Sequence, residues 1–281
     1  MKTPPEVYLI VEGLGAVLIA ASLIGFILHL SVKDGKARST VNNLNARIRA
    51  WWVMVILLSS AALTGRAATV VLFVLLSFSA LREFEPVRLV SVIVLLAQYW
   101  FVWNGSYGWF LVFVPVCAIL LRSWGLILCV YCISYVPALL TLEISRGVLL
   151  MAFLIIVVQS SDVLQYVFGK LFGHHKIAPE LSPGKTVEGF IGGIAGATIL
   201  GASLWWITPF DPAQAAAMAF VIALTGFMGG LTLSAIKRRR GIKDWGQFIE
   251  GHGGLLDRLD SVCFSAPLFF HLTRCFFIVQ S

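Results

Sequence analysis

The stretch VYLIVEGLGAVLIAASLIGFILHL, residues 7–30, decides the class of fold of this 281-residue chain. It contains no Lys or Arg, and Glu12 is its one acidic side chain. About 20 consecutive, mainly apolar residues are enough for a helix to cross a bilayer. The stretch follows a short polar start and is longer than the apolar part of a cleavable signal peptide, so it predicts a retained transmembrane helix.

The rest of the chain has the same apolar character. Hydrophobic residues make up 59% of the sequence and charged residues 12%, and the mean hydropathy is +0.90. We therefore predict an all-α, polytopic integral membrane protein with about 8–10 transmembrane helices. The expected spans are roughly 7–30, 50–65, 67–81, 87–103, 107–121, 124–142, 147–168, 189–207, 215–236 and 259–279. The short pair 50–65 and 67–81, which Arg66 divides, is also compatible with a re-entrant hairpin.

The charge pattern predicts which side of the membrane each loop faces. The net charge is +7, and with these spans 17 of the 21 Lys and Arg residues fall in loops on one face. Basic loops remain in the cytoplasm. We therefore expect a multi-pass protein of the inner, cytoplasmic membrane, with loops 33–49, 169–188 and 237–258 facing the cytoplasm. We divide the chain into N-terminal transmembrane helices, 1–146, and a C-terminal transmembrane region, 147–281, that carries the last two loops.

Residues 234–260, SAIKRRRGIKDWGQFIEGHGGLLDRLD, are unusually polar for such a chain. Six Lys or Arg and four Asp or Glu lie in these 27 residues. The glycines of GHGG (251–254) have no Cβ, so the backbone amides there can approach a ligand closely. Asp257 and Asp260 are three residues apart, a spacing that places both carboxylates on one face of a helix. Carboxylates beside Lys and Arg suit a magnesium–phosphate site.

A second polar segment, QSSDVLQYVFGKLFGHHKIAPELSPGKTVEGFIGG (159–193), is expected on the same side of the membrane. Asp162 lies near the end of an apolar helix, where a carboxylate is costly and usually faces a cavity or a partner. The SPGKT motif (182–186) lacks the first glycine of a P-loop and does not follow a strand, which argues against an ATPase. Lys185 and the neighbouring hydroxyls still suit a phosphate group. The alternative is that both segments are solvated connectors without chemistry.

These segments resemble the CDP-diacylglycerol synthases, or phosphatidate cytidylyltransferases, over about residues 160–265. The matching signature runs Ser234-Ala-Ile-Lys-Arg238, then Lys243-Asp244, then Gly251-His-Gly-Gly-Leu-Leu-Asp-Arg-Leu-Asp260. The resemblance implies a membrane nucleotidyltransferase that condenses CTP with phosphatidic acid to CDP-diacylglycerol and pyrophosphate, in phospholipid or glycolipid synthesis. The cofactor it implies is Mg²⁺, alone or with a second, monovalent cation. The expected partners are CTP, phosphatidic acid and membrane lipid, with a homodimer as one option and no nucleic acid.

The resemblance also implies roles for individual residues. Catalytic roles fall to Asp257, Asp260, Lys243 and Asp244. Metal-binding roles fall to Asp162, Asp257 and Asp260. Substrate-binding roles fall to Lys185, Ser182, Lys237, Arg238, His252, Gly253, Gly254 and Arg258.

One departure from the family pattern bears on activity. Family members have an Asp, expected to bind metal, four residues before the Ser of the signature, and this chain has Gly230 there. Loss of a carboxylate ligand weakens catalysis by a bound metal ion. Three hypotheses follow: an active, divergent enzyme in which Glu250 or another carboxylate substitutes; a partner subunit that binds lipid or nucleotide without turnover; or a transporter or scaffold on the same architecture. Scarce intramembrane charge and the lack of an inverted repeat of broken helices argue against the third.

Overall fold

The computed structural model describes residues 4–32, 35–142, 146–246 and 253–277. Within these ranges the chain is helical apart from connecting loops, and its one strand-like pairing is an antiparallel bridge between Lys176 and Thr186. The helices are α1 (Pro5–Ser31), α2 (Lys36–Thr64), α3 (Arg66–Phe84), α4 (Leu89–Asn104), α5 (Tyr107–Leu121), α6 (Cys132–Ala138), α7 (Gly147–Leu171), α8 (Val187–Ser203), α9 (Pro212–Arg239) and α10 (Leu256–Phe277). Short helical turns lie at Leu126–Tyr131, Leu139–Thr141 and Trp205–Ile207.

Several of these helices are suited to a bilayer. Among the described residues, five are long and apolar enough to cross it: α1, the Leu44–Thr64 part of α2, α3, α7 and α9. Shorter apolar helices cover Leu89–Asn104, Tyr107–Leu121, Leu126–Thr141 and Val187–Ser203. Large apolar side chains such as Val17, Leu30 and Ile119 remain exposed, as expected for groups that face lipid. The prediction of an all-α, polytopic membrane protein is confirmed, while the number of crossings stays a prediction.

The segment that follows α1 differs from the sequence prediction. α2 begins at Lys36, so most of the expected loop 33–49 is helical. Long basic side chains such as Arg47 can lie along a helix while their charged ends reach polar surroundings, so a basic sequence need not end the helix. α2 and α3 have 29 and 19 residues and meet at Gly65, whose φ of +115° is readily adopted by glycine alone. These lengths favour two crossings over a short re-entrant hairpin.

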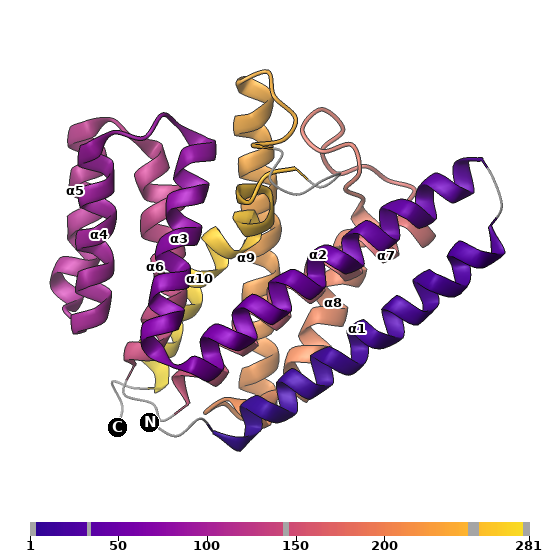
Figure 1. Cartoon of the computed structure of the whole chain (residues 1–281), viewed down its shortest axis with the longest axis horizontal. Coiled ribbons are helices and arrows are strands. Elements are labelled where there is room, and N and C mark those ends of the chain that lie inside the picture. The colour runs from indigo at the N-terminus through magenta and orange to yellow at the C-terminus, as the bar shows by residue number, and fades with distance from the viewer. Residues whose placement is uncertain (1–3, 33–34, 143–145, 247–252, 278–281) are drawn as a thin grey trace.

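The helices form two groups joined through α10 (Figure 1). α3, α4, α5 and α6 stand together on one side, and α7, α8 and α9 pack against one another on the other side. α10 packs against both α9 and α6, so it links the groups. α1 and α2 form a long antiparallel hairpin that runs obliquely past α7 and α8 in this view.

Glycines on α8 allow it to approach α7 closely. A Cβ at Gly189 would lie 2.6 Å from the backbone oxygen of Gln165, and one at Gly192 would lie 2.5 Å from the ring of Phe168. A Cβ at Gly196 would meet the side chain of Leu164 at 2.8 Å. Small residues at such positions let membrane helices pack backbone to backbone. The GFIGGIAG sequence therefore fixes the start of α8 beside the polar end of α7.

The sequence at each end of α9 explains why the helix begins and ends there. The Asp211 side chain accepts a hydrogen bond from the Gln214 N–H at 2.8 Å, and the Gln214 side chain accepts one from the Asp211 N–H at 3.0 Å. This reciprocal pair caps the first turn. Lys237, Arg238 and Arg239 lie in the last turn, where the helix dipole favours positive charge. The basic cluster therefore lies at the end of the bundle where the polar loops lie.

Candidate active site

A cavity of about 320 Å³ lies where α7, α9 and α10 meet the loop that precedes α8. Its lining comprises Asp162, Gln165, Tyr166, Ser182, Gly184, Lys185, Thr186, Gly189, Phe190, Phe227, Asp257, Arg258, Asp260 and Ser261. Six residues that the sequence singled out are therefore brought together: Asp162, Ser182, Lys185, Asp257, Arg258 and Asp260. In Figure 1 the loops after α7 and after α9 lie at the same end of the molecule. The two polar segments meet, as their topology predicted.

Asp162, Lys185 and Asp260 form one charged part of the cavity, and Asp257 and Arg258 are further charged residues of its lining. Asp162 comes from α7, Asp260 from α10 and Lys185 from the loop before α8. Burial lowers the pKa of Lys185 from its usual value, while the nearby carboxylates of Asp162 and Asp260 oppose that shift. The ammonium lies 4.4 Å from the centroid of the Phe227 ring and 3.5 Å from the Phe227 backbone oxygen. A lysine held in this way can meet an anionic ligand without first being ordered.

Gly230 faces this charged part directly. A Cβ built at Gly230 would lie 2.8 Å from Nζ of Lys185 and 3.6 Å from Oδ2 of Asp260. The position at which the family pattern has an Asp therefore lies next to two residues of the cavity lining, although Gly230 itself is not part of that lining. In this chain the lysine ammonium is the nearest charged atom to it.

Asp257 is bound by three donors of the protein itself. Its Oδ1 accepts a hydrogen bond from the Lys237 ammonium at 2.6 Å, and its Oδ2 accepts from the backbone N–H groups of Trp245 and Gly254, both at 2.9 Å. The Lys237 and Asp257 side chains are only 12% and 10% exposed. Asp257 thus ties the polar loop to α9, and its role as a metal ligand stays a prediction.

The structure explains why a glycine is needed at position 253, just before α10. Gly253 has a φ of +79°, a conformation that disfavours other residues. A Cβ there would also lie 2.7 Å from Oδ2 of Asp257. Neither Gly253 nor Gly254 lines the cavity. His252 and Glu250 lie outside the described residues.

The remaining predicted residues lie around the cavity and not in it. Lys243 and Asp244 are exposed on the loop after α9. Arg238 donates from Nε to the Leu181 backbone oxygen at 3.3 Å, which joins the two polar loops. Direct roles for Arg238, Lys243 and Asp244 in catalysis or binding stay predictions.

Glu83, at the end of α3, is a residue that the sequence analysis missed. Its two carboxylate oxygens accept hydrogen bonds from the backbone N–H groups of Leu255 and Leu256, each at 2.8 Å. Leu256 is the first residue of α10 and Leu255 directly precedes it, so Glu83 accepts from backbone donors at a helix start, which have no partner within the helix. Next to Glu83, the ring of Phe84 lies 4.9 Å from that of Trp245, and Arg240 lies over both rings. The position of Glu83 at the border of an apolar span could have marked it as a residue with a specific role. Its spacing from other residues, however, did not indicate that it contacts the start of α10.

Arg47 was also missed, and the capping role of Thr186 was not predicted. Thr186 is 3% exposed, lines the cavity and caps α8, because its hydroxyl oxygen accepts a hydrogen bond from the Gly189 N–H at 3.1 Å. The guanidinium of Arg47, on α2, lies 4.7 Å from the centroid of the Tyr166 ring, and Tyr166 lines the cavity. The N-terminal hairpin therefore reaches the site.

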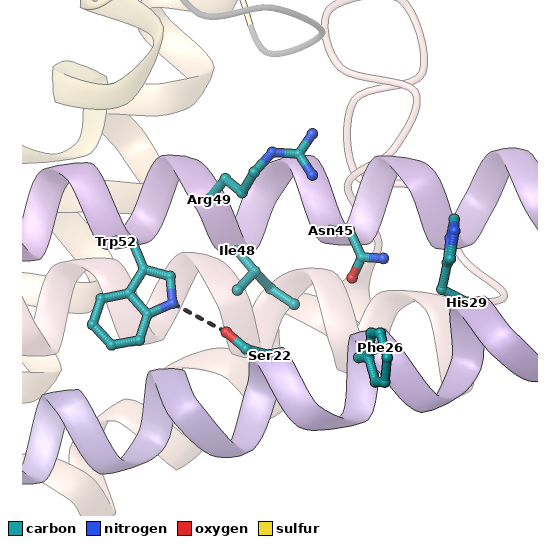
Figure 2. Close-up of a pocket in the computed structure, with 7 residues that line it drawn as sticks. All are labelled: Ser22, Phe26, His29, Asn45, Ile48, Arg49 and Trp52. Carbon is teal, nitrogen blue, oxygen red and sulfur yellow. Dashed lines mark hydrogen bonds between the residues drawn. The ribbon is translucent and has the colours of Figure 1, made fainter.

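A second cavity, of about 300 Å³, lies between α1 and α2 (Figure 2). Its lining comprises Ser22, Phe26, His29, Asn45, Ile48, Arg49 and Trp52. Trp52 Nε1 donates to the Ser22 hydroxyl at 3.0 Å, and the Asn45 side chain donates to the Gly25 backbone oxygen at 3.3 Å. These bonds hold the two helices together. None of the predicted site residues belongs to this lining, so the first cavity is the candidate active site.

The donor set of the first cavity fits one hard cation. In the part of the chain that the structure describes, no group of three or more His, Cys, Asp and Glu side chains could hold a metal ion. Asp162 and Asp260 still place two carboxylates on the lining of the same cavity. Mg²⁺ is commonly bound through one or two carboxylates together with substrate phosphates. The pair therefore fits a single Mg²⁺ that the substrate completes, and not a cage made by the protein alone.

These features define a class: a multi-pass helical membrane protein with a charged site, suited to phosphate groups, at one end of its bundle. The chain belongs to the cytidylyltransferase family, whose model matches residues 45–276. The resemblance seen in the sequence is thereby confirmed.

Several bacterial proteins are similar to this chain, and two of them are named phosphatidate cytidylyltransferases. A protein of Escherichia coli (strain K12), described as "Uncharacterized protein YnbB", is 36% identical over 292 residues, which cover 92% of this chain and 95% of that protein. A phosphatidate cytidylyltransferase of Staphylococcus saprophyticus is 40% identical over 126 residues, 44% of this chain and 48% of that enzyme. The enzyme of Staphylococcus aureus (strain COL) is 37% identical with the same coverage. The chain thus matches about half the length of the staphylococcal relatives.

Proposed function

We propose that the protein is a phosphatidate cytidylyltransferase-type nucleotidyltransferase. It condenses CTP with phosphatidic acid to CDP-diacylglycerol and pyrophosphate, for phospholipid or glycolipid synthesis. The observation that carries the proposal is the gathering of Asp162, Lys185, Arg258 and Asp260 around one cavity in a member of the cytidylyltransferase family. The names of the staphylococcal relatives support phosphatidic acid as the acceptor.

The reaction joins two anions. A phosphate oxygen of phosphatidic acid attacks the α-phosphorus of CTP, and a new P–O bond forms. The bond from the α-phosphorus to the bridging oxygen of the β-phosphate breaks, and pyrophosphate leaves with that electron pair. The attacking oxygen is already anionic at neutral pH, so no base is needed to activate it. The tasks of the protein are to align the two groups and to neutralise their charge.

The cavity residues are suited to these tasks. Lys185 and Arg258 present positive charge to the phosphates from two different segments. Behind Thr186, the start of α8 adds the partial positive charge of a helix N-terminus. Ser182 and Ser261 provide hydroxyl groups on the same lining. When Mg²⁺ is bound by Asp162 and Asp260, it supplies further charge neutralisation at the phosphates.

The two substrates reach the cavity from different phases. CTP enters from the water at the polar loops, which we place on the cytoplasmic side of the inner membrane. Tyr166 lines the cavity, and Val163 and Val167 beside it on α7 are exposed, so acyl chains can lie along this face. Arg47, over the Tyr166 ring, adds a positive charge at the same edge that suits the lipid phosphate. A homodimer and the division at residue 146 remain predictions.

The proposal is tested with purified protein in mixed micelles that contain phosphatidic acid, a neutral diacylglycerol or no acceptor. Pyrophosphate release from CTP is measured with Mg²⁺ present, and CTP binding is measured separately by equilibrium dialysis. We expect release that depends on phosphatidic acid and that Asp260→Asn abolishes. CTP binding without release under any condition would indicate a partner subunit without turnover and would refute the proposal.

A further inference from the structure

The cavity between α1 and α2 is lined by several hydrogen-bond donors and by no acidic side chain (Figure 2). None of its seven lining residues is an Asp or a Glu. The side chains of Ser22, Asn45 and Trp52 each donate a hydrogen bond within the α1–α2 hairpin. His29 and Arg49 are the two lining residues whose donors point to something else. The cavity therefore suits a ligand that supplies oxygen acceptors.

The imidazole of His29 carries a buried N–H group without an acceptor. Its Nε2 lies 3.0 Å from Nη2 of Arg38. A guanidinium can only donate, so Nε2 accepts this bond, and the proton of the neutral ring is on Nδ1. Nδ1 is buried and has no hydrogen-bond partner among the residues that the structure describes. A buried donor without a partner is costly, which indicates an acceptor from outside the chain.

Arg49 adds a positive charge to the same cavity. In the part of the chain that the structure describes, its guanidinium has no ion pair or hydrogen bond. Arg49 is the sixth residue of the apolar segment Leu44–Thr64, so its Cα lies about 7 Å inside that segment at 1.5 Å per residue. A long basic side chain at this depth extends toward the polar surface. In Figure 2 it runs along α2 toward the end of the hairpin where His29 lies, so both donors are expected near the level of the lipid headgroups.

The lining is also apolar on the side of α1. Phe26 lines the cavity and is nevertheless 60% exposed. Leu23 and Leu30 are exposed as well, and their spacing of three and four residues from Phe26 places all three on one face of α1. An exposed apolar face on a membrane helix suits acyl chains. A ligand with a phosphate at one end and acyl chains at the other therefore matches both parts of the cavity, whereas a phosphate ion matches the donors alone.

We infer that the α1–α2 cavity is a second lipid site, which binds a membrane phospholipid of net negative charge. The phosphate oxygens accept hydrogen bonds from Nδ1 of His29 and from the Arg49 guanidinium, and the acyl chains lie along the apolar face around Phe26. The two cavities have no lining residue in common, so this lipid is distinct from the acceptor of the proposed reaction. A phosphodiester such as phosphatidylglycerol has the required charge, whereas phosphatidylcholine is neutral overall.

The test counts lipids bound to the full-length protein by native mass spectrometry. Purified protein in detergent, freed of bound lipid, is titrated separately with phosphatidylglycerol, phosphatidylcholine and glycerol 3-phosphate. We expect the first phosphatidylglycerol to bind about fivefold more tightly than phosphatidylcholine, the size expected for one basic residue near a membrane surface. Glycerol 3-phosphate should bind far more weakly than phosphatidylglycerol, because it has no acyl chains to bury.

Two arginines on α2 provide a matched pair of variants. Arg49→Gln should weaken binding of the first phosphatidylglycerol about fivefold and leave binding of phosphatidylcholine unchanged. Arg47→Gln removes the same charge two residues away, but Arg47 lies over Tyr166 of the first cavity, so it should leave binding of the first phosphatidylglycerol unchanged. His29→Phe keeps an aromatic ring and removes the N–H group, and it should weaken this binding about tenfold. If His29→Phe does not fold, the two arginine variants decide.

Equal affinities for phosphatidylglycerol and phosphatidylcholine overturn the inference, as do equal effects of Arg47→Gln and Arg49→Gln. Glycerol 3-phosphate that binds as tightly as phosphatidylglycerol indicates a site for a soluble phosphate and overturns the inference as well. Because no turnover is measured, these outcomes are independent of the proposed reaction. A protein that fails to convert CTP but gives the expected lipid pattern refutes the proposed function and leaves the inference standing.

Discussion

Replacing Asp257 by Asn tests whether this residue is the anchor of the polar loop. The substitution keeps the size of the side chain and removes the charge that Lys237 contacts at 2.6 Å. An Asn oxygen can still accept hydrogen bonds from the backbone N–H groups of Trp245 and Gly254. The Lys237 ammonium, in contrast, loses the carboxylate oxygen to which it donates. The loop should loosen from α9 even though no apolar contact is lost.

The expected magnitude follows from the burial of the pair. Removal of one partner of a buried ion pair costs about 3–5 kcal/mol, because the other charge stays buried. The two side chains are 12% and 10% exposed, and Asn retains two of the three hydrogen bonds, so we expect about 3 kcal/mol, the lower end of that range. Lys237→Met alone should cost less. The double variant should cost less than the sum of the single ones, with a coupling energy of about 1–3 kcal/mol.

The free energy of unfolding is measured in mixed micelles by titration with a denaturing detergent. Asp244→Asn, an exposed carboxylate in the same loop, is the control and should change stability by less than about 0.5 kcal/mol. If Asp257→Asn is as stable as Asp244→Asn and the cycle is additive, Asp257 does not anchor the loop. A loss of turnover in Asp257→Asn would then point to metal binding instead.

Four further predictions concern single residues. Glu83→Gln loses one of two charged hydrogen bonds to the start of α10 and should destabilise the protein by about 1.5–3 kcal/mol in the same titration. Asp260→Asn should abolish CTP turnover with an unchanged melting temperature, and activity near that of the wild type would show that Asp260 holds no metal. Arg47→Gln should raise the KM for phosphatidic acid about fivefold and leave the KM for CTP unchanged. The control is Arg49→Gln, which should change neither KM because Arg49 lines the other cavity. Cys introduced by Ser182→Cys should resist labelling from outside intact cells, and ready labelling would reverse the assigned sidedness.

The sequence predicted the membrane fold because composition and the length of apolar stretches depend only on local residues. It also predicted that the two polar segments meet, since the spans placed both on one face, and both segments line one cavity. It did not predict that Lys237 pairs with Asp257, because both charges suit a phosphate or a metal when read singly. Nor did it indicate that Glu83 caps α10, a contact between residues far apart in the chain that no periodicity encodes. The helical start of α2 was not predicted, because basic residues are typical of the loops that follow a span.

Among the predicted site residues, some line the cavity and others do not. Asp162, Lys185 and Asp260 were chosen for their chemical type, and the structure brings them to one cavity. Lys243 and Asp244 were chosen from the same signature, yet they are exposed on the adjoining loop. A linear motif does not distinguish side chains that line a site from those that shape the loop around it. Packing decides that difference, here through Asp257 and the glycines next to it.

Transfer of the cytidylyl group of CTP to a lipid phosphate in this cavity can be followed with two labels. Purified protein, phosphatidic acid and Mg²⁺ are incubated with CTP labelled at the α-phosphate and, in parallel, at the γ-phosphate. The α-label should move into the lipid phase as CDP-diacylglycerol while an equal amount of γ-label appears in water as pyrophosphate, and Asp260→Asn should leave both labels in CTP. If wild-type protein binds CTP but both labels stay in it, or if the γ-label is released as single phosphate without lipid labelling, the proposed function is wrong.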